Sequence, residues 1–532
     1  MQVLLSLPWW VYVLVLLLVL AMRDMLQKKH TIQHNFPLVG HLRYMIEKIG
    51  PELRQYIVAN NREELPFNRR QRSWIYASSK KENNYQGFGT DQNMHEAGYI
   101  FIKPALFPTR LPKTHPHHIH NTTHLNHYLL PAAKVIGLAH GRRRPYRPRS
   151  VVNISAMSYG SLSANAVEAL NKGSLKFGNF HNTGEGGLSP YHSFGADVVF
   201  NMGTAYFGVR DDDGNFVLEK LVQMTQQNPF VRMIELKLSQ GAKPGKGGLL
   251  PGSKITAEIA AIRHVPLGKD VVSPAYHSAF TGVQGMIDFI EEIAEATGLP
   301  VGIKAAVGKL DLWEELADLM ALTGKGPDFI AIDGGEGGTG AAPPAFADHV
   351  ALPWVHGFSK VYTLFQKRHL TEKITFIGSG KLGLPAHAIM AFAMGADIVN
   401  IAREAMLSIG CIQAQICHTN RCPTGVATNN PWLQAGLDPT LKSERFYNYM
   451  KTITKEIIEI THAAGYEHPC QFTMDDVEVA MGDNNHTLPL LSVYNYAKDE
   501  VPYSGFDPLI TCAYLGGSGN AVRPEQGGQK IA

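Results

Sequence analysis

Apolar positions in residues 151–462 follow two alternating patterns. Short runs of apolar and β-branched residues are separated by stretches whose apolar positions recur every three or four residues. In GVQGMIDFIEEIAEATG, for example, Val283, Ile287 and Ile290 fall on one helical face, and LWEELADLMALTG is a second such helix, ended by Gly324. Apolar strands joined by crossover helices predict a parallel sheet covered on both faces. The expected strands are 151–158, 232–240, 300–307, 328–335, 374–380 and 396–402.

This stretch is long enough to close into a (β/α)8 TIM barrel, so we predict an α/β fold of that class. Several expected strands end in polar residues or glycines instead of plain turns, among them Gln240, Lys304 and Asp333. The carboxyl ends of barrel strands are where active sites lie, so these residues mark the expected site.

The first residues form a different pattern, because Val3 to Met22 contains no charged side chain. Its length suits one bilayer-spanning helix, although a signal peptide or a buried core helix has a similar composition. Basic residues follow the apolar run at Arg23, Lys28 and Lys29, which favours an uncleaved anchor over a signal peptide. The positive-inside rule then places the barrel in the cytoplasm, so we expect a single-pass protein of the inner (cytoplasmic) membrane, anchored by residues 1–22.

Two regions flank the expected barrel. Residues 23–150 show no steady period and predict an irregular cytoplasmic arm or cap, and residues 463–532 form a C-terminal extension. Six histidines lie between 115 and 127, a composition that can bind metal, but proline and asparagine break their spacing. The arginine run at 142–149 is read as a solvated linker, with contact to anionic headgroups as the alternative.

Composition excludes some classes of protein. The 532 residues carry a formal net charge of +3, which is too small to indicate a nucleic-acid partner. Five cysteines in so long a chain do not form a disulfide framework. Two of them, Cys470 and Cys512, are expected to be buried structural thiols.

Two glycine-rich loops follow expected strands, GGEGGTG at 334–340 and GSGKLG at 378–383. Glycines in such places let backbone N–H groups approach a phosphate. Neither loop is a Walker motif, and we do not expect a dinucleotide-binding site. The alternatives are a phosphate-bearing cofactor and ordinary tight turns.

The remaining cysteines form a C-x5-C-x4-C triplet, Cys411, Cys417 and Cys422. Soft thiolates in one loop suit an iron–sulfur cluster, and three of them match a cluster with three protein-held irons. A zinc site and three free thiols are the alternatives, although zinc usually takes four ligands including a closer cysteine pair.

These motifs resemble the FMN-binding synthase domain of glutamate synthase, over roughly residues 150–440. The resemblance rests on IELKLSQGAKPGKGGLLPG, IAIDGGEGGTGAAPPAFADHVALPW and GADIVNIAREAMLSIGCIQAQICHTNRCPTGVAT. It implies a barrel that carries FMN at the strand carboxyl ends and a 3Fe-4S cluster on residues 411–422. The implied cluster ligands are Cys411, Cys417 and Cys422. The implied FMN-binding residues are Met157, Ser158, Gly160, Gln240, Lys304, Gly338, Thr339, Gly378, Ser379, Gly380 and Arg403.

The resemblance also implies a substrate site. Lys243 and Arg263 match the cations that grip 2-oxoglutarate in the family, and Glu185 matches a retained acidic residue. Lys246, Leu249 and Leu188 depart from the family, where Glu, Gln and an acidic residue are usual.

We therefore expect an oxidoreductase that reduces the imine of 2-oxoglutarate and ammonia to glutamate. Because the chain opens Met1-Gln2, without the N-terminal cysteine nucleophile of the family's amidotransferase domain, ammonia is expected from outside. Since no dinucleotide site is expected, the electrons are expected from a ferredoxin-like or membrane-side donor. The alternatives are a membrane-coupled enzyme acting on another amino or oxo acid, and a tethered barrel without turnover. The sequence leaves open the true substrate and direction, the donor, the nitrogen source and the oligomeric state.

Overall fold

The computed structural model describes residues 8–27, 30–109, 130–482 and 486–496. The histidine-rich stretch at 115–127 and Cys512 therefore lie outside the described residues. The chain forms two compact units, Met1–Arg72 and Ser73–Ala532, which are described separately.

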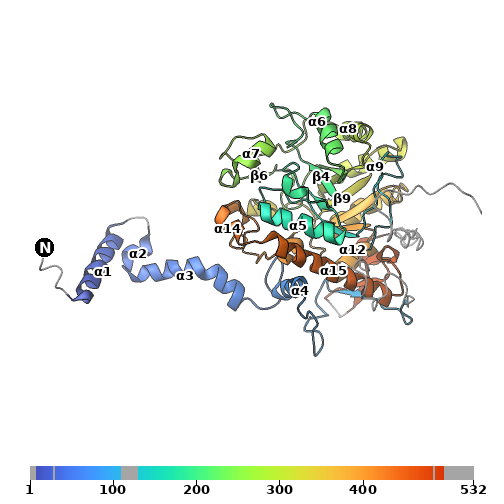
Figure 1. The fold of residues 1–532 in the computed structure, drawn as a ribbon. Helices are drawn as coiled ribbons and strands as arrows, with labels where there is room; N and C mark the ends of the chain where they lie inside the picture. The colour runs from blue at the N-terminus through green and yellow to red at the C-terminus, as the bar shows by residue number, and fades with distance from the viewer. Residues whose placement is uncertain (1–7, 28–29, 110–129, 483–485, 497–532) are drawn as a thin grey trace, which may run out of the picture. The chain divides into compact units, whose positions relative to one another are not determined.

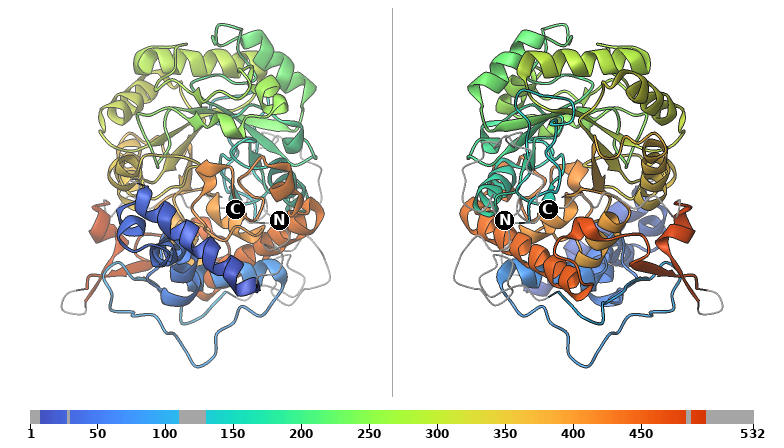
Figure 2. Two further views of the ribbon diagram at one scale, coloured as in Figure 1. Left: turned by 90° about the vertical axis from the view of Figure 1, so that its left-hand side faces the viewer. Right: turned by 90° about the vertical axis from the view of Figure 1, so that its right-hand side faces the viewer.

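The second unit contains a closed barrel of eight parallel strands in the order β10-β11-β2-β3-β4-β5-β8-β9. Figure 2 shows helices arranged around these strands. The (β/α)8 architecture expected from the sequence is thus confirmed. The strands are β2 (Val152–Ile154), β3 (His181–Asn182), β4 (Val198–Met202), β5 (Val231–Lys237), β8 (Val301–Ala306), β9 (Phe329–Asp333), β10 (Thr375–Ser379) and β11 (Ile398–Ile401).

Amphipathic helices cover the barrel, as their periodicity predicts. In α8 (Gly282–Thr297), the apolar positions Val283, Ile287 and Ile290 are buried, and in α9 (Asp311–Thr323) the left-handed Gly324 ends the helix. The other helices of the barrel region are α5 (Ala164–Phe177), α6 (Leu218–Gln227), α7 (Ala257–Arg263), α10 (Pro344–His349), α11 (Trp354–Gln366), α12 (Pro385–Ala393), α13 (Arg403–Ser408), α14 (Pro431–Ala435) and α15 (Pro439–Ala463), with 3-10 turns η3 (Pro190–His192), η4 (Gly252–Lys254) and η5 (Cys417–Thr419).

The arm and the C-terminal extension meet in one small antiparallel sheet. Strand β1 (Ile100–Ile102) pairs with β12 (Val477–Ala480), which pairs in turn with β13 (Thr487–Pro489). The extension also forms η6 (Pro469–Gln471) and α16 (Leu490–Tyr494). Helix α15 lies alongside α5 (Figure 1), where a Cβ at Gly173 would come within 2.9 Å of the Ser443 carbonyl oxygen. Glycine is therefore needed at that helix contact.

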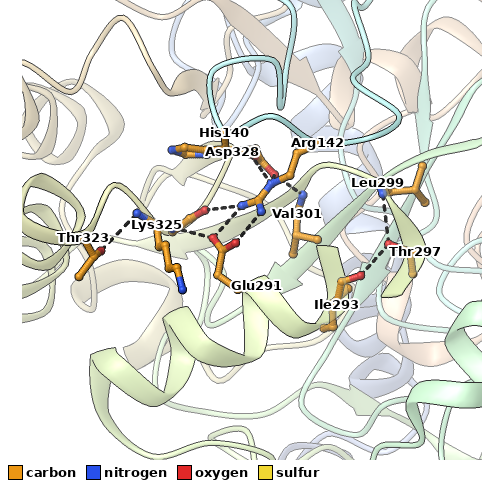
Figure 3. A network of polar contacts seen from close by, with 11 residues as sticks. His140, Arg142, Glu291, Ile293, Thr297, Leu299, Val301, Thr323, Lys325 and Asp328 are labelled. Atoms are coloured by element: carbon orange, nitrogen blue, oxygen red, sulfur yellow. Dashed lines mark hydrogen bonds and ion pairs between the residues drawn. The ribbon is translucent and has the colours of Figure 1, made fainter. Parts of the chain in front are cut away.

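An ionic network closes the base of the barrel beside the first residues of β8 and β9 (Figure 3). Arg142 donates to both carboxylate oxygens of Asp328 at 3.0 Å and to Glu291 at 2.6 and 2.8 Å. His140 lies 2.8 Å from Asp328, whose second oxygen accepts from the Val301 amide at 2.7 Å. Part of the arginine run expected to be a solvated linker is thus buried here, because Arg142 is only 8% exposed and has two carboxylate partners.

The first unit is largely helical, so the expectation of an irregular arm is wrong for residues 31–58. It contains α1 (Trp9–Leu26), α2 (Thr31–Asn35), α3 (Val39–Leu53), the π-helical turn η2 (Arg54–Val58) and the first residues of α4 (Arg69–Lys80). Helix α1 is long and apolar enough to cross a membrane, and almost all of it is exposed. It extends past the expected end at Met22, so that Arg23 and Asp24 lie in its last turn.

Candidate functional site

The barrel interior carries a buried polar group near the carboxyl ends of its strands. Glu235 on β5 accepts hydrogen bonds from Asn182 at 2.9 Å and Asn201 at 2.5 Å, and Lys304 on β8 lies 3.5 Å away. Burial opposes the charge of Lys304, but Glu235 and Asp333 keep its pKa above the ordinary lysine value. Lys304 is therefore a fixed cation in the buried interior of the barrel.

Next to this group, Glu185 and Lys237 form an ion pair of 2.9 Å at the mouth. Lys237 also donates to Gln240 at 2.7 Å, and the Gln240 amide donates to Thr339 at 3.1 Å. The structure thus brings together Gln240 and Thr339, two residues expected at one cofactor. Besides Glu185, Lys237 and Gln240, the pocket here is lined by Thr204, Leu238, Ser239, Gly245, Lys246, Gly247, Gly248, Pro274 and Ala275.

Three cations act on the single carboxylate of Glu185. Burial raises the pKa of this carboxyl, but Lys237, Arg263 and Lys243 together bring it below the ordinary value. Burial lowers the pKa of Lys243 to about 8, with further lowering by Lys237 and Lys246, and its ammonium donates to the Ala341 carbonyl at 2.7 Å. The excess of positive charge fits an anionic ligand with two carboxylates.

Arg263, which is expected to bind the substrate, is almost completely buried. At the end of α7 it is 4% exposed, and its guanidinium donates to the Tyr159 carbonyl at 2.7 Å and to Ser158 Oγ at 3.2 Å. Its Nε is buried and has no hydrogen-bond partner among the described residues. Arg263 thus holds the turn after β2 and keeps one donor group unused.

The glycine loops after β9 and β10 offer unused backbone donors. Within the described chain, the N–H groups of Gly338, Thr339 and Gly380 donate no hydrogen bond. A Cβ at Gly338 would come within 2.8 Å of Arg403 Cδ, so this loop passes close to Arg403. Arg403 begins α13 and donates to the Glu336 carbonyl at 2.6 Å. Amides and a guanidinium at the late strands of a barrel fit a phosphate group.

Gly378 and Ser379, the other two loop residues expected to bind FMN, contact neighbouring side chains. A Cβ at Gly378 would come within 2.7 Å of the Trp354 indole, so glycine there permits close packing. Ser379 Oγ lies 3.4 Å from Ser155 Oγ. Beside them, Asp333 Oδ1 is buried without a hydrogen-bond partner in the described structure, and burial raises the pKa of this carboxyl.

The turn after β2 contains Met157, Ser158 and Gly160, which were expected to line the flavin. Three side chains from separate segments bind its consecutive carbonyl oxygens: Arg263 binds Tyr159, Asn429 binds Gly160 at 3.0 Å and Lys254 binds Ser161 at 2.6 Å. Gly160 has a positive φ of 101°, which favours glycine there. The turn is therefore fixed from outside the barrel.

Two of those side chains also connect the turn to the cysteine loop. Lys254 Nζ lies 3.4 Å from the Cys417 carbonyl oxygen, and Asn429 lies seven residues after Cys422. Asn420, inside the loop, accepts from the Asn429 amide at 2.7 Å and donates to the Ser253 carbonyl at 2.7 Å. From the arm, the Tyr76 hydroxyl donates to the Cys411 carbonyl at 2.7 Å.

Cys411, Cys417 and Cys422 line one pocket. The Gln413 amide lies 3.4 Å from Cys411 Sγ, and Thr424 Oγ1 lies 3.5 Å from Cys422 Sγ. No group of three or more His, Cys, Asp or Glu residues in the described ranges is arranged to hold a single metal ion. In an iron–sulfur cluster, each thiolate binds a different iron. The pocket and its donors to sulfur fit a cluster.

The sequence did not single out three participants: Lys237, Lys254 and Asn429. Lys237 lies three residues before Gln240 at the end of the same strand, so the rule that strand ends carry the site could have found it. Lys254 ends the 3-10 turn η4 and Asn429 lies in a loop, and only the folded chain places them between the turn after β2 and the cysteines. His277, also missed, lies 2.9 Å from the Lys237 carbonyl oxygen.

Comparison with known proteins agrees with these features. The model of the family described as a conserved region in glutamate synthase matches residues 112–467. The glutamate synthase large subunit-like protein YerD of Bacillus subtilis is 39% identical over 493 residues, covering 88% of this chain and 91% of that protein.

More distant relatives match only the central part. An archaeal glutamate synthase [NADPH] of Methanocaldococcus jannaschii is 36% identical and shares 59% of each chain. A ferredoxin-dependent glutamate synthase of Pyropia yezoensis is 30% identical over 62% of this chain and 21% of its own length. The matched family region and the long alignment with the Bacillus subtilis protein show that the chain belongs to the glutamate synthase family.

Proposed function

We propose that this protein is an FMN- and 3Fe-4S-dependent oxidoreductase that forms glutamate from 2-oxoglutarate and ammonia. The two substrates, 2-oxoglutarate and ammonia, condense to an imine with loss of water. Two electrons and two protons then reduce the C=N bond of this imine to an amine. When bound, FMN supplies hydride transfer and the cluster supplies single-electron transfer.

One observation carries this proposal: the loop of three cysteines is bonded to the turn after β2 through Lys254 and Asn429. A thiolate cluster and a barrel-mouth cofactor would therefore occupy adjoining sites. If the cysteine loop and the turn after β2 had only separate structural roles, no side chain would need to bind both of them.

The described residues suggest how FMN would be held. The amides of Gly338, Thr339 and Gly380, together with Arg403, would bind the phosphate, with Gly378 and Ser379 shaping the same loop. Met157, Ser158 and Gly160 would line the ring. Gln240 and the fixed cation Lys304 would face its polar edge, where positive charge favours the reduced anionic ring.

On the substrate side, Lys243 and Arg263 would bind the two carboxylates. Glu185, paired with Lys237, would orient these cations and is the carboxylate available to the imine nitrogen or its proton. The closely packed glycines around Glu185 keep it in place, since a Cβ at Gly248 would come within 2.2 Å of its Oε1.

A second substrate class has support from Lys246. This residue lines the pocket where the family usually has an acidic residue, and Leu249 replaces a substrate-contacting glutamine. An oxo acid with more negative charge or a different side chain would suit that change. A panel of 2-oxo acids with ammonium separates the two possibilities.

The membrane location is also a proposal, supported by the exposed apolar helix α1. The electron donor would be a reduced ferredoxin or a membrane-side carrier, as for the ferredoxin-dependent relative.

The test is spectroscopic and catalytic. Purified protein should show flavin bands and iron–sulfur absorption, and with reduced ferredoxin it should convert 2-oxoglutarate and ammonium to glutamate. Cys417→Ser should remove the iron–sulfur signal and leave the flavin, whereas Cys470→Ser, outside the loop, should change neither. Protein that lacks both chromophores would refute the proposal.

A further inference from the structure

Helix α3 carries a continuous apolar face that nothing in the described chain covers. Successive residues of an α-helix are about 100° apart, so six apolar positions fall within an arc of about 120°. The charged residues Arg43, Glu47, Lys48 and Glu52 occupy the rest of the circumference. The apolar side chains, 39% to 71% exposed, are Val39, Leu42, Met45, Ile46, Ile49 and Leu53.

The start of α3 is fixed to the end of α1 within the same compact unit. Asp24, in the last turn of α1, is 3% exposed and accepts from the Leu38 amide at 3.0 Å and from His41 Nε2 at 2.8 Å. Gln27 ties the connector by donating to the His30 carbonyl at 2.8 Å. A bilayer that contains α1 would therefore have the first turn of α3 at its surface.

We propose that α3 lies on the lipid surface with this apolar face buried in the interface, which rests on the proposal above that α1 spans a membrane. An interfacial helix has this combination of a wide apolar face and a charged opposite face. A coiled coil with a second copy requires several sustained heptads, whereas α3 has 15 residues and contains Pro51.

The charges of α3 predict how it binds. Arg43 pairs with Glu47 at 2.9 Å, and Lys48 is offset by Glu52 one turn later. With so little net charge, attraction to anionic lipids is weak, so burial of apolar surface must hold the helix. Contact with lipid should therefore persist in neutral phosphatidylcholine and at high salt.

Photo-crosslinking of the full chain in phosphatidylcholine nanodiscs tests this placement. The photoreactive residue p-benzoyl-phenylalanine is placed at Ile46, at Lys48 on the opposite face, or at Leu16 in α1. We expect at least fivefold more lipid adduct at position 46 than at 48, unchanged in 0.5 M salt, which screens surface charges beyond about 3–10 Å.

The three positions separate the possible failures. Lipid adduct at 16 with equal, low labelling at 46 and 48 would overturn the placement of α3 alone. A crosslinked dimer at 46 without lipid adduct would show a second copy on this face and also overturn it. No adduct at position 16 would instead refute the membrane proposal for α1.

Discussion

Single buried lysines determine what the barrel mouth can bind. Lys243 is held at a pKa of about 8 by burial and by the neighbouring Lys237 and Lys246, so it loses its proton within an accessible pH range. The protonated form attracts a carboxylate, and the neutral form does not. Rising pH should therefore weaken binding of an oxo acid, while the opposite dependence would hold for a cationic ligand.

We predict that the KM for 2-oxoglutarate rises by up to tenfold per pH unit above about pH 8, reflecting one required proton. Lys243→Met should raise KM by roughly 10- to 100-fold at pH 7, as loss of a charged hydrogen bond does, and should abolish this pH dependence. Steady-state kinetics between pH 6.5 and 9.5 measure both effects. Lys325→Met, at an exposed lysine, is the control, and an unchanged KM profile in Lys243→Met would contradict the assignment.

Lys254 offers a second prediction at this scale. Its ammonium is buried and bonded to the Ser161 and Cys417 carbonyl oxygens, so it places a positive charge beside the cysteine pocket. Such a charge favours the reduced, more negative state of a cluster. Lys254→Gln should lower the reduction potential by tens of millivolts, measured by a redox titration followed by EPR. Lys254→Arg keeps the charge and should retain most of the potential.

Among the structural elements, the barrel base is held by Arg142 between Asp328 and Glu291. Removing one partner of a buried ion pair leaves an uncompensated charge, which costs about 3–5 kcal/mol. Arg142→Leu should reduce the free energy of unfolding by that amount without changing the flavin spectrum, because the network lies at the end of the barrel away from the site. Chemical denaturation measures the loss, and Arg143→Leu, at an exposed neighbour, is the control.

The same network has a pH dependence with a definite sign. Burial raises the pKa of Glu291, but Arg142 and the Gly326 amide bring it below its value of 4.5 in the unfolded chain. Its contribution to stability is therefore complete above pH 4.5 and is lost as pH falls through the lower folded pKa. Wild-type protein should lose this increment on acidification, and Arg142→Leu should lose less. Equal acid sensitivity of both proteins would contradict the role of the pair.

Elements were predictable where their apolar pattern was strong. Six of the eight barrel strands and helices α8 and α9 follow the pattern, because their side chains face apolar layers. Strand β3 was missed because His181 and Asn182 face a buried polar interior, and β4 carries Asn201 into the same group. Within the arm, residues 31–58 were misjudged as irregular, because the helical spacing of apolar positions in α3 extends over only 15 residues of a long stretch without a steady period.

At the scale of the whole molecule, the candidate site could be predicted only as separate motifs. The cysteine triplet and the glycine loops were visible as spacings, and the structure brings Gln240 to Thr339 and Gly338 to Arg403. Lys254 and Asn429 could not be predicted, since each acts through backbone carbonyls that are far away in sequence. The roles of all these residues remain predictions that the cofactor-loaded protein can test.

We predict that the electrons come from a protein donor and not from NADPH. The glycine loops at 335–340 and 378–383 both contain G-x-G-x-x-G, but they follow strands of a closed barrel and not of the open sheet that such a fingerprint requires. The archaeal relative named for NADPH shares only 59% of its length with this chain. The cysteine loop, in contrast, has the exposed residues Gln415, Ile416 and Arg421, through which a protein donor could reach it. Reduced ferredoxin should therefore bleach the flavin absorbance in an anaerobic titration, while excess NADPH leaves it unchanged.

Cys417→Ser should block reduction by ferredoxin but permit reduction by dithionite, which reaches the flavin directly. Rapid bleaching by NADPH alone would show that the chain binds a dinucleotide and needs no protein donor.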